Sequence, residues 1–386
     1  MIAVAESPDL LMELPPATNG EIAVVNLKSA LQASWNRFWR DPQRPGVAEV
    51  IVEQEQQAAQ YLGDLDALDR LEILVNRFIR TDSESSRIAL VQAQFASITH
   101  RFAEARDHAA KAESLGAPSE IVSRLSLSIE QACGTHLDSV LEKRRRMSAE
   151  SGGLEDLVPL GSLLADLGNF AEADRTYGRA LQAYQDVSPF AFAWVCFQLG
   201  ALWGELIPVP ELIRAARWYR KAIDYLPCYV KARVHLAEIF LSFGQCEEAE
   251  ALLHPVIDSS DPEVAWRLAD VLNATGRFAE AEAQLQAARG GFAVLLDKHL
   301  LAFADHGAEF YAGSGGNPTR AYELARLNLA NRPTLRAFEL AYATATVADE
   351  APAATEILGA ARIRWGATTA FRLSSLGMLQ SGGVAT

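Results

Sequence analysis

The sequence lacks the cysteine patterns that mark a disulfide-rich protein or a cysteine-ligated metal site. Its 386 residues include four cysteines, which have no paired spacing: Cys133, Cys196, Cys228 and Cys246. A disulfide framework in a small domain needs a denser set, and zinc modules need C-x-x-C pairs. Both classes of protein are therefore excluded.

Basic residues are scarce relative to acidic ones. The chain has 35 Lys and Arg against 49 Asp and Glu, which gives a formal net charge of −14. Proteins that bind nucleic acid need an excess of cations to neutralise phosphates. We therefore expect no nucleic-acid partner. The hydrophobic content of 49 % is that of a globular chain rather than a disordered one.

Targeting and membrane-spanning segments are also missing. The first twenty residues contain three acidic residues and no Lys or Arg, whereas a secretory signal begins with basic residues. The longest uncharged run, residues 187–204, just reaches the length of a membrane span, but it is interrupted by Ser188, Pro189 and Gln198. We predict a mobile leader over residues 1–20, no membrane span and a cytoplasmic protein.

No catalytic motif is present. The chain has no G-x-S-x-G, no H-E-x-x-H and no cysteine close to a histidine in a nucleophile-like setting. His299, His306 and Glu309 would share one face of a helix, as metal ligands can, but no fourth ligand is evident. We predict a protein that is not an enzyme and that holds no cofactor and no metal.

The sequence does contain an internal repeat. A glycine is followed five residues later by alanine, then by an aromatic residue or leucine, then by a second alanine; the two fullest copies are Gly168, Ala173, Tyr177, Ala180 and Gly276, Ala281, Leu285, Ala288. The first alanine recurs at Ala173, Ala215, Ala249 and Ala281, in steps of 42, 34 and 32 residues. A period near 34 with a glycine turn predicts stacked helix–turn–helix units.

This pattern resembles the tetratricopeptide repeat (TPR) family, in the form of bacterial TPR-containing proteins, over about residues 86–345 and more loosely back to Gly46. The resemblance implies an all-α, right-handed α-solenoid of about eight helical hairpins, in which each unit buries its apolar faces against its neighbours. We expect one solenoid over residues 21–380 with a C-terminal capping helix, and a flexible tail over 381–386. The clearest units are expected at about 154–187, 193–229, 230–261, 262–290 and 302–335.

Small residues fit this packing. Gly161 and Gly200 would let the two helices of a unit approach closely, and Tyr177 and Tyr219 would fill the space between units. Extra residues between Gly200 and Ala215 predict a proline-rich turn.

The resemblance also implies that the first helix of each unit lines a concave groove. The groove positions of the family, carried over residue by residue, give a partner-binding set: Trp194, Phe197, Val234, Glu238, Leu241, Trp266, Asp270, Asn273, Phe303, His306 and Phe310. The set is aromatic and acidic, which favours a protein or peptide partner with a basic segment. Whether Trp194, Phe197 and Trp266 face the groove or pack between units stays open.

These observations predict a non-catalytic scaffold or adaptor that binds a peptide or a partner protein in the concave groove. Two alternatives remain open. One is a regulatory or accessory subunit of an enzyme complex, which would use the convex face or an end of the stack. The other is an enzyme or metal protein with its site in the groove. Homo-oligomerisation is compatible with each of them.

Overall fold

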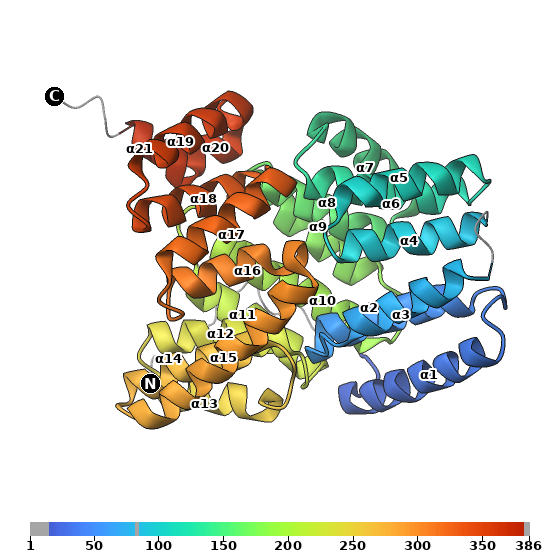
Figure 1. Ribbon diagram of the computed structural model, residues 1–386, viewed down its shortest axis with the longest axis horizontal. Helices are drawn as coiled ribbons and strands as arrows, with labels where there is room; N and C mark the ends of the chain where they lie inside the picture. Colours follow the sequence, from blue (N-terminus) through green and yellow to red (C-terminus); the bar gives the residue numbers. More distant parts are fainter. Residues whose placement is uncertain (1–14, 82–84, 382–386) are drawn as a thin grey trace.

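The computed structural model describes residues 15–81 and 85–381, and within them the chain is helical with no strand (Figure 1). The predicted all-α fold is therefore confirmed. Most of the expected leader, residues 1–14, and the tail from 382 onward lie outside the described residues. No helix in the described part is long and apolar enough to cross a membrane.

The helices follow one another with short connections. The first half contains α1 (Gly20–Arg40), α2 (Val47–Leu62), α3 (Ala67–Ile79), α4 (Ser86–Ile98), α5 (Phe102–Ser114), α6 (Ser119–Ala132), α7 (Leu137–Ser151), α8 (Leu154–Asp166) and α9 (Phe170–Ala183). The middle contains α10 (Pro189–Ala201), the π-helix η2 (Leu202–Leu206) and α11 (Leu212–Tyr225). The last part contains α12 (Val230–Ser242), α13 (Cys246–Leu253), the short 3₁₀ helix η3 (His254–Val256), α14 (Pro262–Ala274), α15 (Phe278–Lys298), α16 (Leu300–Ala312), α17 (Pro318–Asn331), α18 (Leu335–Val347), α19 (Ala351–Trp365), α20 (Thr369–Leu373) and α21 (Ser375–Ser381).

Helices pair into hairpins that stack side by side, as the repeat predicts. The pairs α8/α9, α10/α11 and α14/α15 are joined by tight contacts, and Gly168 and Gly276 end the first helix of their pairs with φ of 81° and 75°. A Cβ atom at Gly161 would lie 2.7 Å from the ring of Tyr177. The expected close approach of helices is thus present, and only glycine fits there.

Two features differ from the expectation. The extra residues after Gly200 begin as η2, a wide helical turn that continues α10 and holds Glu205, and the proline-rich loop follows it. π-Helical turns are rare and concentrate at functional sites. At the C-terminus, the single capping helix expected near 366–380 is two short helices, α20 and α21.

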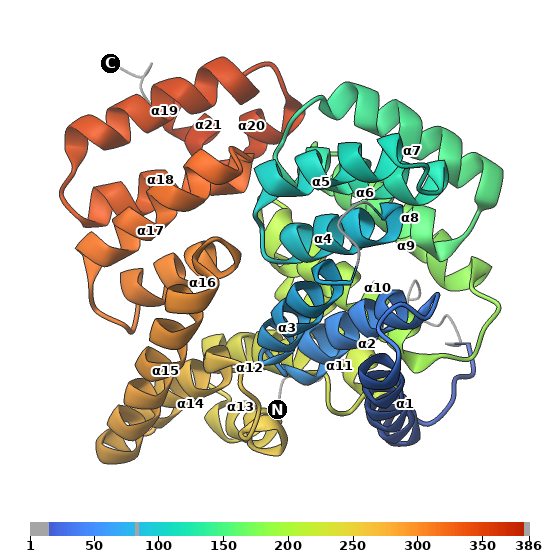
Figure 2. The same cartoon turned by 45° about the vertical axis from the view of Figure 1, so that its right-hand side comes forward.

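The solenoid curls back until its two halves touch. The Leu65 N–H donates to Ser260 Oγ at 2.7 Å, and α2 packs against α12. Figure 2 shows α1–α3 beside α10–α12, on the same side of the molecule. Further along, Asn331 Nδ2 donates to the His100 carbonyl at 2.9 Å. Part of the concave face therefore lies inside the molecule.

Candidate functional site: charged residues on the concave face

Four residues of the predicted partner-binding set are part of the core. The exposed fraction is 0 % for Phe310, 1 % for Val234, 4 % for Trp266 and 8 % for Phe197. Phe310 stacks on Phe292 with ring centroids 4.7 Å apart. The interpretation of these four side chains as direct partner contacts is corrected, because they pack between helices and leave almost no surface for a partner.

The other predicted residues keep accessible surface. Trp194, Leu241 and Phe303 are half-buried and Asn273 is exposed. Trp194 stacks on Phe197 with centroids 6.0 Å apart. The remaining three, all half-buried, belong to ion pairs: Glu238, Asp270 and His306.

The concave face carries a line of polar side chains that includes the predicted Glu238 and Asp270, together with His235 and Arg267, each one residue after a buried residue of the predicted set. In α12, Lys231, His235 and Glu238 are half-buried, whereas Val234 is buried. Steps of four and three residues place these three side chains on one face of the helix. The same spacing recurs in α14, at Glu263, Arg267 and Asp270.

Glu205 from η2 forms the ion pair at the start of this line. Its Oε1 accepts hydrogen bonds from Tyr219 Oη at 2.7 Å and from His235 Nδ1 at 2.8 Å. Burial alone would raise the pKa of Glu205, but His235 and Arg336 lower it to about 2. Burial likewise opposes the charge of His235, yet Glu205 and Glu238 raise its pKa to about 9. Both partners are therefore charged at neutral pH.

Arg267 continues the line in the next unit. Its guanidinium contacts Glu238 and lies 3.4 Å from Asp270. It also stacks over Trp266, with 3.6 Å from the guanidinium carbon to the ring centroid. The Trp266 indole donates to Ser314 Oγ, which in turn donates to Asp270 at 2.6 Å. Trp266 is thus a buried platform that orients the charged pair above it.

His306 in α16 forms a further pair. Its Nδ1 lies 2.5 Å from Glu263 Oε1, and the neighbouring Asp305 contacts Arg332. Burial disfavours the charged imidazole, but Asp305 and Glu263 raise the pKa of His306 to about 10. Although burial acts in the opposite direction, His306 and Arg332 lower the pKa of Asp305 to about 2.

Arg336 lies beside one carboxylate and within electrostatic range of others where these helices converge. The Arg336 side chain is 63 % exposed, and its guanidinium lies 3.9 Å from Glu205. It also interacts electrostatically with Glu309 and Asp166, and the three acids come from η2, α16 and α8. We call Asp166, Glu205, Glu309 and Arg336 the inner cluster. Asp166 and Glu309 keep accessible surface, yet the protein around them excludes part of their water and raises the pKa of both carboxyls, so a further cation beside them would be favourable.

The two histidines tested as metal ligands have separate partners. His299 Nε2 donates to Asp69 Oδ1 at 3.0 Å, whereas His306 contacts Glu263. Over residues 15–81 and 85–381, no group of three or more His, Cys, Asp or Glu side chains is arranged to hold a metal ion.

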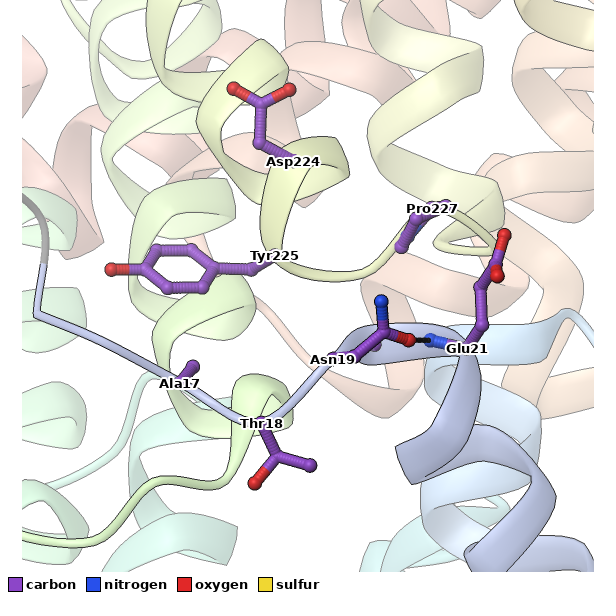
Figure 3. A pocket seen from close by; sticks show the side chains of 8 residues that line it. Ala17, Thr18, Asn19, Glu21, Asp224, Tyr225 and Pro227 are labelled. Carbon is purple, nitrogen blue, oxygen red and sulfur yellow. Dashed lines mark hydrogen bonds between the residues drawn. The ribbon is translucent and has the colours of Figure 1, made fainter.

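A separate hollow of about 340 Å³ lies where the N-terminus of α1 meets the end of α11 (Figure 3). Asn19 Oδ1 accepts from the Glu21 N–H at 3.0 Å, and Tyr225 Oη donates to the Pro15 carbonyl at 3.0 Å. The side chains there cap α1 and hold the preceding residues, and they are distinct from the inner cluster.

Sequence reasoning missed the residues that complete the concave line: Tyr219, His235, Arg267, Asp305 and Arg336. The available signal was the recurrence of charged residues at steps of four and three in consecutive first helices. The prediction instead chose the apolar residues one position earlier, Val234 and Trp266.

No family model matches the chain, and no curated protein matches it. Solved structures of similar shape include the APC/C hetero-tetramer Cut9–Hcn1, with 12 % identity, a TM-score of 0.43, and 94 % of this chain and 74 % of that one covered. Another is the C-terminal part of a TPR repeat-containing protein from Cytophaga hutchinsonii, with 13 % identity, a TM-score of 0.32, and 76 % and 97 % covered. A third is Naa15/Naa10 bound to HypK-THB, with 13 % identity, a TM-score of 0.33, and 89 % and 64 % covered. At these low TM-scores the description of the fold rests on the chain's own helix pairs, turn glycines and buried alanines.

Proposed function

We propose that this protein is a non-catalytic scaffold that binds a basic, extended segment of a partner protein along its concave face. The observation that carries the proposal is the line of charged side chains that successive first helices contribute, which ends at the inner cluster. There, three carboxylates share one arginine that remains largely exposed.

The shape of the line supports an extended ligand. Its members come from η2, α12, α14, α16 and α18, one helix after another along the stack, and the line curves until Arg336 of α18 lies 3.9 Å from Glu205 of η2. The partner segment would follow this curved path. Stacked helical repeats create elongated concave surfaces that can follow a chain segment in this way. The accessible predicted residues Trp194, Leu241, Asn273 and Phe303 would contact the apolar and amide groups of that segment.

The charge balance supports a basic ligand. The inner cluster carries three acids and Arg336, the protonated His235 and His306 act on Glu205 and Glu309, and the whole chain has a formal net charge of −14. Acidic surfaces attract cationic partners over several ångströms and increase the rate of association, chiefly at low salt. A lysine or arginine of the partner could pair with Asp166 and Glu309, which Arg336 alone does not neutralise.

The titration of the histidines argues against their acting as general bases. A general base at neutral pH must be unprotonated. The pKa values of His235 and His306 are raised to about 9 and about 10, so both remain protonated and serve as ion-pair partners.

A second candidate function, an accessory subunit that docks through an end of the stack, has one supporting surface. Ile22, Val25 and Trp39 are exposed on α1, at the N-terminal end of the solenoid. Changing Val25 to Asp should then release a co-purifying partner without affecting binding of basic peptides.

The test uses two fluorescent peptides of equal length, one alternating Arg and Ala and the other alternating Glu and Ala, with binding measured by anisotropy. We expect binding of the Arg peptide, weakened by salt and by the double change Asp166→Asn and Glu309→Gln. Glu280→Gln is the matched control, because Glu280 pairs with Arg277 on the exposed outer surface. Equal affinity for the two peptides, or an equal loss in the control variant, would contradict the proposal.

A further inference from the structure

Turns in the first half of the chain meet loops in the second half in regular succession. The turns are those of Gly63, His100, Gly134 and Gly168, and the loops they meet lie at about 259–261, 299–301, 331–334 and 364–370. We call this line of contacts the seam. From each contact to the next, the turn and the loop both move along the chain by roughly one repeat. The seam therefore joins one superhelical turn of the solenoid to the next.

At the first position, the turn after α2 is held by a serine. Ser260 Oγ accepts from the Leu65 N–H at 2.7 Å and donates to the Gly63 carbonyl at 3.0 Å. Just beyond, Asp69 accepts from Lys298 Nζ at 2.5 Å and from His299 Nε2 at 3.0 Å.

At the second position, His100 takes the place of a turn glycine. Its φ is 56°, a left-handed value that is uncommon for residues other than glycine. Its Nδ1 donates to the Leu301 carbonyl at 3.2 Å, and its own carbonyl accepts from Asn331. Both bonds cross the seam, so the histidine gives this turn an anchor that a glycine would not provide.

At the last positions the backbones themselves come close. Arg364 Nη2 donates to the Gly134 carbonyl at 2.8 Å, and a Cβ at Gly134 would lie 3.0 Å from the Trp365 ring. A Cβ at Gly168 would lie only 2.8 Å from the Ala370 backbone nitrogen.

The seam is more polar than the packing between consecutive units. Neighbouring units share continuous apolar clusters, the largest of which joins buried residues from Leu157 to Ile239 and also includes Tyr61 from across the seam. Across the seam, the main apolar contact is at its N-terminal end, where Tyr61 packs against Phe190 and Tyr229 with centroids 5.1 and 5.0 Å away. Toward the other end, Leu137 packs against the apolar cluster that contains Trp365, and the Trp365 ring lies against Gly134. Between these two ends, hydrogen bonds and a partly exposed ion pair hold the seam. Since such contacts contribute little individually, the seam should open before the stack unfolds.

The seam also borders the charged space on the concave face. His100 lies close enough to Asp305 and Arg332 to interact with them electrostatically, and Asp166 does so with Arg336. His100 and Asp166 belong to the first half of the chain, and the other three residues to the second. Separating the two halves would therefore open one wall of this space and move Asp166 away from Arg336.

We propose that the seam is a gate: the solenoid alternates between this closed form and a form opened along the seam, and the closed form limits access to the inner cluster. The opening itself is independent of the proposed function, whereas the control of access rests on it.

The first experiment tests the opening without any ligand. The triple variant Asp69→Ala, Ser260→Ala, Asn331→Ala removes polar seam contacts at two positions, and Glu280→Ala is the surface control. We expect the amides of Ala67 and Leu68, whose own acceptors are the carbonyls of Asp64 and Leu65 within the same turn, to exchange their hydrogens at least about tenfold faster, and the radius of gyration from X-ray scattering to rise, with unchanged helical circular dichroism. Unchanged exchange and unchanged radius would overturn the gate. Should the triple variant unfold, the same exchange measurement on Asn331→Ala, read at the turn of His100, decides the question.

The second experiment closes the gate covalently. A carbodiimide activates the Asp69 carboxyl, and Lys298 Nζ displaces the activating group, so that an amide bond forms and the carbodiimide leaves as a urea. Mass spectrometry identifies the linked peptides, and Asp69→Asn protein treated in the same way is the control. We expect the linked protein to bind the Arg–Ala peptide with an association rate at least about tenfold lower than the treated control, and the triple variant to bind it faster than wild type.

The outcomes separate the two proposals. If neither protein binds the peptide, the proposed function fails, while the exchange and scattering results still decide whether the seam opens. If the peptide binds with the same rate to linked and control proteins, the gate is refuted and the scaffold remains.

Discussion

The ion pair between Glu205 and His235 makes a sharp prediction about stability and its dependence on pH. Replacing Glu205 with Gln removes the charge next to His235 while an amide oxygen can still accept the hydrogen bond from Tyr219. The imidazole then loses its main stabilising partner at 2.8 Å and remains within 3.7 Å of Glu238. The pKa of His235 should fall from about 9 toward its ordinary value of 6.5.

The expected change in the free energy of unfolding follows from the pKa shift of His235. Moving a pKa from 6.5 to about 9 corresponds to about 3 kcal/mol of differential interaction, at 1.36 kcal/mol per unit. The side chains of Glu205 and His235 are 31 % and 23 % exposed, so water screens part of this interaction. We expect Glu205→Gln to lower the free energy of unfolding by about 2 kcal/mol.

The sign of the pH dependence is fixed by the raised pKa. The contribution of His235 to stability is fully present below pH 6.5, where the unfolded chain also binds the proton, and it is lost as the pH rises through about 9. Between these values the wild-type protein should lose stability more steeply than Glu205→Gln. Urea unfolding at several pH values measures the slopes, and carbon-detected NMR of labelled histidine measures the pKa. A wild-type His235 that titrates near 6.5, or parallel stability profiles for the two proteins, would refute the reasoning.

Three further predictions concern packing. Gly200→Ala should destabilise the protein by about 1–3 kcal/mol, because the new Cβ would lie 2.5 Å from the Tyr219 ring. In the control, Gly178→Ala, the new Cβ meets no atom within 4 Å, so this change should be neutral or stabilising. Urea unfolding compares the two variants. Ala249→Trp should lower the thermal midpoint strongly, because the Ala249 side chain is fully buried, and a midpoint equal to wild type would show that its environment can rearrange. Trp266→Ala should cost about 3 kcal/mol of stability through the loss of a buried aromatic side chain, whereas Asn273→Ala, about two helical turns further along α14 and exposed, should cost little. Equal losses would contradict the assignment of Trp266 to the core.

The repeat made the helix pairs predictable because its signals are local. A glycine with positive φ, an alanine facing it and an aromatic ring beside them act within one hairpin or between neighbours, as Gly161 and Tyr177 do. The pattern could not distinguish Val234 from His235 as the residue on the concave face. A shift of one position turns a side chain by about 100° around the helix, and the apolar residues at both the groove and the unit interface obscured that difference.

The seam could not be predicted from the sequence, for a different reason. Contacts such as Asn331 with His100 join residues 231 positions apart, and they form only if the small rotation between successive units adds up to a closed superhelical turn. A few degrees more or less per unit would leave the turns of the first half facing solvent. The polar residues on both sides of the seam have no apolar periodicity, so they are typical of an exposed surface when only the sequence is read. The same property limits the cost of opening the middle of the seam, where the residues are stable in water, whereas opening its ends would expose Tyr61 and Trp365, which are buried in the closed form.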